Sequence, residues 1–108
     1  MMANIVFSPE ARRDLLEIGD YVAFKLHNKS AARKLIGRFQ KSVLVLQKFP
    51  ESGSPLDYTG PHILYRYLIC GNYMIFYHLS DEHVCVDRIL YGRRDYLSIL
   101  FGDELSEE

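Results

Sequence analysis

Three apolar stretches, separated by two short turns, constrain the fold of this chain more than any other part of its sequence. They span residues 63–70, 73–79 and 84–91, and all three are rich in β-branched and aromatic residues. The turns between them, residues 71–72 and 80–82, are too short to join anything but antiparallel neighbours. The sequence therefore predicts an antiparallel β-meander, with the second stretch, which is apolar on both faces, as its central strand.

Two amphipathic segments precede the meander and can cover its apolar face. Apolar residues recur at helical spacing across residues 11–26 and again across residues 30–49. Ser8 and Pro9, just before the first segment, are typical of a helix N-terminus. Gly37 lies inside the second predicted helix, where we expect it to let the first helix approach closely. The two segments predict an antiparallel helical hairpin packed on the meander.

The remaining segments complete an α+β fold. A β-rich run at residues 4–7 predicts an N-terminal strand that joins the sheet, and residues 95–101 predict a short C-terminal helix. Residues 50–62 contain three prolines and two glycines, so we expect a loop there. By length the chain is a single domain, residues 1–108, in which the acidic tail at residues 102–108 is expected to fray.

Charge and composition exclude several classes of function. The net charge is −1, so a nucleic-acid role would have to rest on a local basic patch. No Cys or His cluster has metal-ligand spacing, and we expect neither a metal ion nor a cofactor. The sequence shows no basic-then-apolar leader and no apolar run of about 18 residues. We therefore expect a cytoplasmic protein without membrane contact, in which Cys70 and Cys85 stay reduced.

The charged side chains of the second predicted helix are all basic. No acidic residue interrupts them between residues 29 and 48. A solvated helix face is one interpretation, and a docking surface for an acidic partner or a phosphate backbone is the other. The basic residues are Lys29, Arg33, Lys34, Arg38, Lys41 and Lys48.

Four arginines lie in or directly after the predicted meander. Arg66 and Arg88 are flanked two residues away by apolar residues, so each is either bonded to carbonyls or a carboxylate or lies on an open face. Asp87 is expected on the face opposite Arg88 and so is not an obvious partner for it. Arg93 and Arg94 follow the third strand, where adjacent guanidinium groups suit a carboxylate or a phosphate. A surface ion pair with a nearby acid is the simpler alternative for Arg94.

Tyrosines, rather than lysines, are the abundant polar residues of the meander. Metal-free cleavage of RNA needs a general base, a general acid and cations on the phosphate. The chain has no lysine after Lys48, which weakens a nuclease interpretation. Tyrosines at this density are more often packing or interface residues.

Several runs of residues follow one another in an order typical of one protein family. They are Ser8-Pro9-Glu10-Ala11 with Asp14-Leu15, then Leu46-Gln47-Lys48-Phe49-Pro50-Glu51-Ser52-Gly53, Arg66-Tyr67-Leu68, Tyr73-Met74-Ile75-Phe76-Tyr77, and Arg88-Ile89-Leu90-Tyr91-Gly92-Arg93-Arg94-Asp95. In this order they resemble the ParE/RelE superfamily, the toxins of bacterial type II toxin–antitoxin systems, and are closer to the ParE branch. The resemblance covers residues 4–97 and implies a RelE/ParE-like fold.

The resemblance also implies a function. A ParE-like toxin inhibits growth by binding its target, here expected to be DNA gyrase, supports plasmid stabilization, and is neutralised in a hetero-oligomer with its cognate antitoxin. Two alternatives stay open: a RelE-like, ribosome-dependent mRNA endonuclease and an inactive toxin-like binding module. The RelE-type catalytic positions that the resemblance identifies hold Tyr65, Tyr67, Met74 and Leu100 here, and only Arg94 keeps its basic character. The nuclease set is therefore mostly missing.

The candidate site residues follow from these patterns. Tyr91 stands where histidine is common in the ParE pattern. For target binding the candidates are Arg88, Arg93, Arg94 and Tyr96. Should the protein be a nuclease, the candidate catalytic residues are Arg88, Arg94, Tyr91 and Tyr96. For antitoxin binding the candidates are Arg33, Lys34, Arg38 and Lys41.

Overall fold

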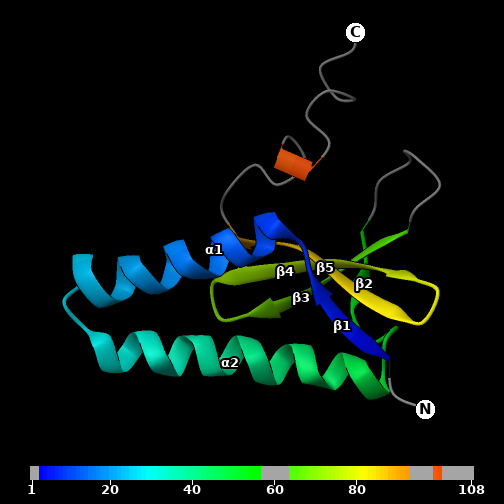
Figure 1. Cartoon of the computed structure of the whole chain (residues 1–108), viewed down its shortest axis with the longest axis horizontal. Helices are drawn as coiled ribbons and strands as arrows, with labels where there is room; N and C mark the ends of the chain where they lie inside the picture. The colour runs from blue at the N-terminus through cyan, green and yellow to red at the C-terminus, as the bar shows by residue number, and fades with distance from the viewer. Residues whose placement is uncertain (1–2, 57–63, 93–98, 101–108) are drawn as a thin grey trace, which may run out of the picture.

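A helical hairpin and a mixed β-sheet make up the part of the chain that the computed structural model describes, namely residues 3–56, 64–92 and 99–100 (Figure 1). The predicted α+β architecture is confirmed, with bounds close to those expected. The elements are β1 (Asn4–Phe7), α1 (Pro9–Asp20), the π-helical turn η1 (Tyr21–Lys25), α2 (Lys29–Lys48), β2 (Ser54–Pro55), β3 (Tyr65–Cys70), β4 (Tyr73–Ser80) and β5 (His83–Tyr91).

The sheet has the strand order β1-β5-β4-β3-β2 among the described residues. Strands β3, β4 and β5 form the predicted antiparallel meander, and β4 is its central strand, as its apolar character on both faces indicated. Strand β1 joins the sheet beside β5 in parallel, from the pair Asn4 and His83 to the pair Phe7 and Val86. The N-terminal strand therefore meets the third strand of the meander, which is also the strand that leads to the candidate site.

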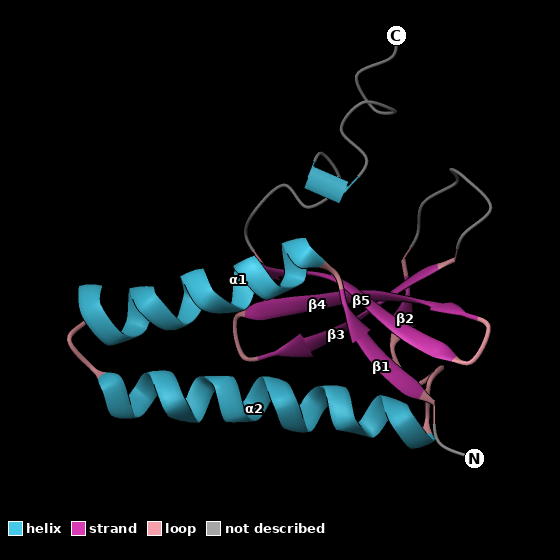
Figure 2. Ribbon diagram, in the orientation of Figure 1, coloured by secondary structure: helices cyan, strands magenta, loops and turns pink. Residues whose placement is uncertain are grey.

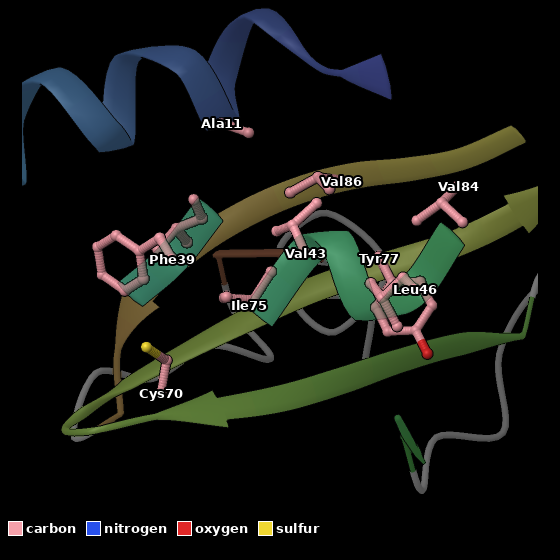
Figure 3. Packing of buried hydrophobic residues seen from close by; sticks show 10 residues of the cluster. Ala11, Phe39, Val43, Leu46, Cys70, Ile75, Tyr77, Val84 and Val86 are labelled. Atoms are coloured by element: carbon pink, nitrogen blue, oxygen red, sulfur yellow. The ribbon is translucent and has the colours of Figure 1, made fainter. Parts of the chain in front are cut away.

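Side chains of the helical hairpin and of one sheet face form the main core. Phe39, Val43 and Leu46 project from α2 toward Ile75 and Tyr77 of the central strand (Figure 3). All five are less than 5% exposed, so α2 contributes much of the apolar burial that stabilises the fold. The two helices lie side by side over this face (Figure 2).

The opposite face of the sheet is also covered, which the sequence analysis did not anticipate. Leu56, Phe76 and Leu90 form a second buried cluster there. Ile99 and Leu100, which are helical, pack against it. The hairpin therefore covers one face of the sheet, and this second cluster lies on the other. The rest of the predicted helix at residues 95–101 lies outside the described residues.

The segment expected to be a loop at residues 50–62 contains a short strand, β2, which pairs with β3. Long-range side chains hold it in place. Arg66 donates from Nη1 to the carbonyl oxygens of Glu51 and Gly53, at 3.1 and 2.9 Å. The buried hydroxyl of Tyr77 accepts a hydrogen bond from the N–H of Gly53 at 2.9 Å. Arg66 is therefore bonded to carbonyls, one of its two predicted alternatives, and residues 57–63 lie outside the described part.

Two details of the hairpin differ from prediction. The first helix is not α-helical throughout, because α1 ends at Asp20 and η1 continues it before the turn at His27, which has a φ of +53°. Gly37 does not allow the helices to approach, since a Cβ placed there would meet no atom within 4 Å. It is Gly19 of α1 that faces α2, because a Cβ placed there would lie 3.7 Å from Ile36.

No described helix is long and apolar enough to cross a membrane. Cys70 and Cys85 are free thiols.

Candidate functional site

A buried ion pair fixes Arg88 at the edge of the sheet. The carboxylate of Asp14 in α1 accepts two hydrogen bonds from the guanidinium of Arg88, from Nε at 2.8 Å and from Nη2 at 2.9 Å. The side chain of Asp14 is 8% exposed and that of Arg88 is 24% exposed. Hydrogen bonding to Asp14 raises the pKa of Arg88, so the guanidinium stays charged. Of the two interpretations left open for Arg88, bonding to a carboxylate is the one that the structure shows.

Asp14 was not among the predicted site residues, although it is the buried partner of Arg88. Asp14 lies three residues after Ala11 and four before Ile18, so it sits within the apolar stripe of α1. An acidic residue at such a position is buried and needs a partner, which is the signal that could have identified it.

The first helix takes over the edge of β5 where β1 ends. The ladder between β1 and β5 stops at Phe7 and Val86. Beyond it, the hydroxyl of Ser8 donates to the carbonyl of Asp87 at 2.8 Å, and Asp14 accepts from the N–H of Ile89 at 2.9 Å. The backbone groups of the β5 edge are thereby bonded without a neighbouring strand.

A β-bulge in β5 reverses which residues share a face. Val86 and Arg88 each have a partner on β4, and Asp87 between them has none, so the register shifts by one residue. Val86 packs in the main core, whereas Leu90 packs in the cluster on the other face. The inference that Val86, Arg88 and Leu90 share one face, and Asp87 the other, is therefore wrong, because it assumed an unbroken strand period.

The bulge brings Asp87 to His78 of the central strand. The Nδ1 atom of His78 lies 2.8 Å from Oδ2 of Asp87. Burial raises the pKa of Asp87, and the hydrogen bond and charge of His78 oppose this shift. The ring of Tyr65 meets the His78 imidazole edge-on, with 5.5 Å between centroids. An imidazole held by a carboxylate has the form of a general base. The sequence analysis missed this pair because the register depends on the bulge.

The structure describes only Arg88 of the predicted target-binding set, and only Arg88 and Tyr91 of the conditional catalytic set. Arg88 lies in its ion pair, and Tyr91, at the end of β5, is 39% exposed and packs edge-on against Tyr73 with 5.7 Å between ring centroids. Arg93, Arg94 and Tyr96 lie outside the described residues, so their role stays a prediction. Across the described ranges, no three His, Cys, Asp or Glu side chains are grouped so as to hold a metal ion.

The predicted antitoxin-binding residues form an unpaired basic face on α2. Arg33, Lys34, Arg38 and Lys41 are all exposed, and none forms an ion pair with another described residue. Leu44, on the same helix, is 57% exposed. We call these four basic residues the basic face of α2. It is exposed and bears cations next to apolar surface, which suits a partner but does not identify one.

Removing Asp14 tests the ion pair. Asp14→Ala leaves Arg88 and the Ile89 N–H without their acceptor, and we expect it to lower the free energy of unfolding by about 3 kcal/mol. Arg88→Met is expected to be destabilising too, while the double variant costs at least about 1 kcal/mol less than the sum. Glu17→Ala, one turn along α1, should change stability by less than about 0.5 kcal/mol. Urea unfolding measures all four, and additive losses would contradict the pairing.

The pH dependence of stability tests the surroundings of Asp87. Because burial raises its pKa in the folded state, the folded protein holds this proton more tightly than the unfolded chain does. The contribution of Asp87 to the stability of the fold is therefore complete below the ordinary aspartate pKa. It is lost as the pH rises through the raised pKa of the folded state. Asp87→Asn keeps an acceptor for His78 without ionising, so we expect equal or higher stability at neutral pH and a flatter profile in acid. Thermal unfolding across pH measures this, with Glu82→Gln as the exposed control. A marked loss of stability at neutral pH would show that the attraction to His78 outweighs burial.

Comparisons with known proteins place the chain in a family. The family model for the ParE toxin of the type II toxin-antitoxin system parDE matches residues 5–96. A search of curated proteins finds no match.

Solved structures of toxin–antitoxin systems share the fold. A chromosomal ParDE system from P. aeruginosa matches with a TM-score of 0.69 and 20% identity, over 83% of this chain and 96% of that one. An archaeal RelE-RelB complex from Pyrococcus horikoshii OT3 matches with a TM-score of 0.58 and 17% identity, over 87% and 99%. The E. coli DinJ-YafQ toxin-antitoxin complex matches with a TM-score of 0.55 and 16% identity, over 94% and 100%. Since the family model spans nearly all of the sheet and the hairpin that these structures share, the chain belongs to the ParE toxin family of type II toxin–antitoxin systems.

Proposed function

We propose that this ParE-family toxin arrests growth by binding DNA gyrase, without catalysis, and that a cognate antitoxin neutralises it in the cytoplasm. The proposal depends mainly on which residues occupy the RelE-type catalytic positions and on how they pack. Tyr65, Tyr67 and Met74, which stand there, pack against the second hydrophobic cluster. Side chains that pack against a core are poor candidates for binding a phosphate, and none of the three carries a cation.

The cations of the meander support the same proposal. Arg66 is bonded to loop carbonyls and Arg88 to Asp14, so both serve structural contacts. Arg93, Arg94 and Tyr96 follow β5 in the sequence and remain our candidates for contacting the target. Tyr91, the last residue of β5, is exposed. A pair of arginines with aromatic neighbours is a common composition for a binding surface.

One observation favours the runner-up, a ribosome-dependent mRNA endonuclease. The imidazole of His78, held by Asp87, could act as a general base on a 2′-hydroxyl. The cations that must stabilise the phosphate would then have to come from Arg93 and Arg94. An endonuclease would therefore need His78 for activity, whereas a gyrase inhibitor would not.

A supercoiling assay tests the proposed target. The purified toxin should inhibit supercoiling of relaxed plasmid by gyrase in proportion to its concentration. Combined Arg93→Ala, Arg94→Ala and Tyr96→Ala should weaken inhibition about tenfold or more, because the proposed contacts are lost. Combined Arg12→Ala and Arg13→Ala, which removes two exposed α1 cations, is the control and should leave inhibition intact.

The contrary outcome is equally specific. Absence of inhibition at excess toxin, together with cuts in translated mRNA that vanish in His78→Ala, would replace the gyrase proposal with the endonuclease. Growth inhibition by neither route would leave the inactive binding module.

The antitoxin is proposed to bind the basic face of α2. The cations there form no ion pair with another described residue. Gly37 lies on the same helix between Lys34 and Lys41, and a Cβ placed there would meet no atom within 4 Å. A glycine inside a helix costs about 1 kcal/mol relative to alanine, so its lack of an internal role is consistent with close approach of a partner. An acidic antitoxin segment would complement the charge.

Neutralising this face tests the antitoxin proposal. Combined Arg33→Gln, Lys34→Gln, Arg38→Gln and Lys41→Gln should weaken antitoxin binding roughly tenfold or more and reduce its salt dependence. Growth inhibition by the free toxin should persist, so the antitoxin would no longer rescue cells. Calorimetry at two salt concentrations measures the affinity, with Arg12→Gln, Arg13→Gln and Lys25→Gln as the charge control. Unchanged affinity would remove α2 from the interface.

A further inference from the structure

A hollow beside the edge of β5 has a lining that the proposed function does not use. It encloses about 500 Å³ between α1 with η1 on one side and the ends of β4 and β5 on the other. Three tyrosines, Tyr21, Tyr73 and Tyr91, line it together with Glu17 and the already paired Asp14. We refer to it as the tyrosine hollow.

The three rings are neighbours with free polar groups. Tyr73 and Tyr91 meet edge-on with 5.7 Å between centroids, and Phe39 supports Tyr73 from behind at 5.4 Å. Burial and then the nearby phenols of Tyr91 and Tyr21 raise the pKa of Tyr73, so Tyr73 stays neutral at physiological pH. None of the three hydroxyls makes a hydrogen bond to another described residue. The rings therefore offer aromatic surface and phenol oxygens to a ligand.

The charge of the hollow is negative. Glu17 is exposed and forms no ion pair within the described ranges, whereas Asp14 is neutralised by Arg88. Among the lining residues that the structure describes there is no lysine or arginine. A carboxylate beside aromatic faces attracts a cation, because the ring quadrupole and the acid act in the same direction.

The backbone is irregular where the hollow begins. Tyr21 is the first residue of η1, and π-helical turns are rare and frequently occur at functional sites. Tyr21 is 53% exposed, so its ring is not held there by burial in the core. This irregularity is independent of the charge and the rings, and it marks the same place.

The surface continues beyond the hollow in a way that suits a polypeptide. A second hollow of about 270 Å³ shares Tyr73 and Tyr91 and extends to Ile69, which is 69% exposed. Phe24 and Leu26, just after Tyr21, expose further apolar surface. A single small molecule would leave most of this uncovered.

We propose that the tyrosine hollow binds the guanidinium group of an arginine side chain carried by a partner protein. The guanidinium stacks on the rings of Tyr73 and Tyr91 and pairs with Glu17, while the flanking residues of the partner cover the adjoining apolar surface. The proposal does not depend on whether the toxin acts on gyrase or on the ribosome.

Titration with blocked amino acids tests the site directly. N-acetyl-arginine methylamide should shift the ring proton resonances of Tyr73 and Tyr91 in a saturable way, and N-acetyl-norleucine methylamide, which lacks the cation, should not. Glu17→Gln and Tyr91→Leu should each weaken binding about fivefold or more. Tyr91→Phe keeps the ring and should retain most of the affinity, and Glu10→Gln, which removes an exposed acid elsewhere on α1, should retain all of it. Amide spectra and melting curves confirm that each variant is folded.

Three outcomes would overturn the proposal. Absence of any shift with the arginine derivative removes the site. Equal binding of the norleucine derivative makes the hollow merely apolar. Tighter binding of free arginine than of the blocked form assigns the hollow to a metabolite instead of a protein side chain.

Discussion

One buried carboxylate joins the helical hairpin to the strand that leads to the candidate site. Asp14 accepts bonds from the Arg88 guanidinium and from the Ile89 N–H. Without Asp14, the N–H of Ile89, at the edge of β5 beyond the end of β1, would have no acceptor. The burial of the Asp14 carboxylate is tolerated only because Arg88 balances its charge. This contact helps to hold α1 against β5, and Tyr21 and Tyr91 both line the hollow beside it.

The same contact changes what β5 can offer to a partner. A guanidinium engaged at two of its nitrogens has fewer donors left for a phosphate or a carboxylate. The other strand arginine, Arg66, is likewise engaged by the carbonyls that hold β2. Among the described residues, the groups that remain exposed for the proposed partners are the ring of Tyr91, the hollow beside it and the basic face of α2. This division suits a toxin that binds one partner to act and another to be neutralised.

The sequence predicted the elements well and their contacts poorly. Helical spacing and short turns yielded the hairpin, the meander and the central place of β4, because these depend on residues a few positions apart. The Asp14 pair was missed although its place in an apolar stripe was visible. The bulge at Asp87 could not be read, because one extra residue leaves no mark on composition but reverses the face of each residue after it. Gly37 was assigned to the wrong neighbour for a similar reason: spacing says that a glycine lies in a helix, not what faces it.

By itself, the sequence determined the two helices, the strands of the meander, their order and, through its motifs, the resemblance to ParE toxins. Tertiary structure decided which polar groups are free. Arg88 and Asp14 are 74 residues apart, and His78 meets Asp87 only through a shifted register. Patterns along a chain report burial and period, which are local, whereas the availability of a charged group depends on the partner that packing brings to it. That is why the fold followed from spacing, while the hollow lined by Tyr21, Tyr73 and Tyr91 emerged only once α1 was placed beside β5.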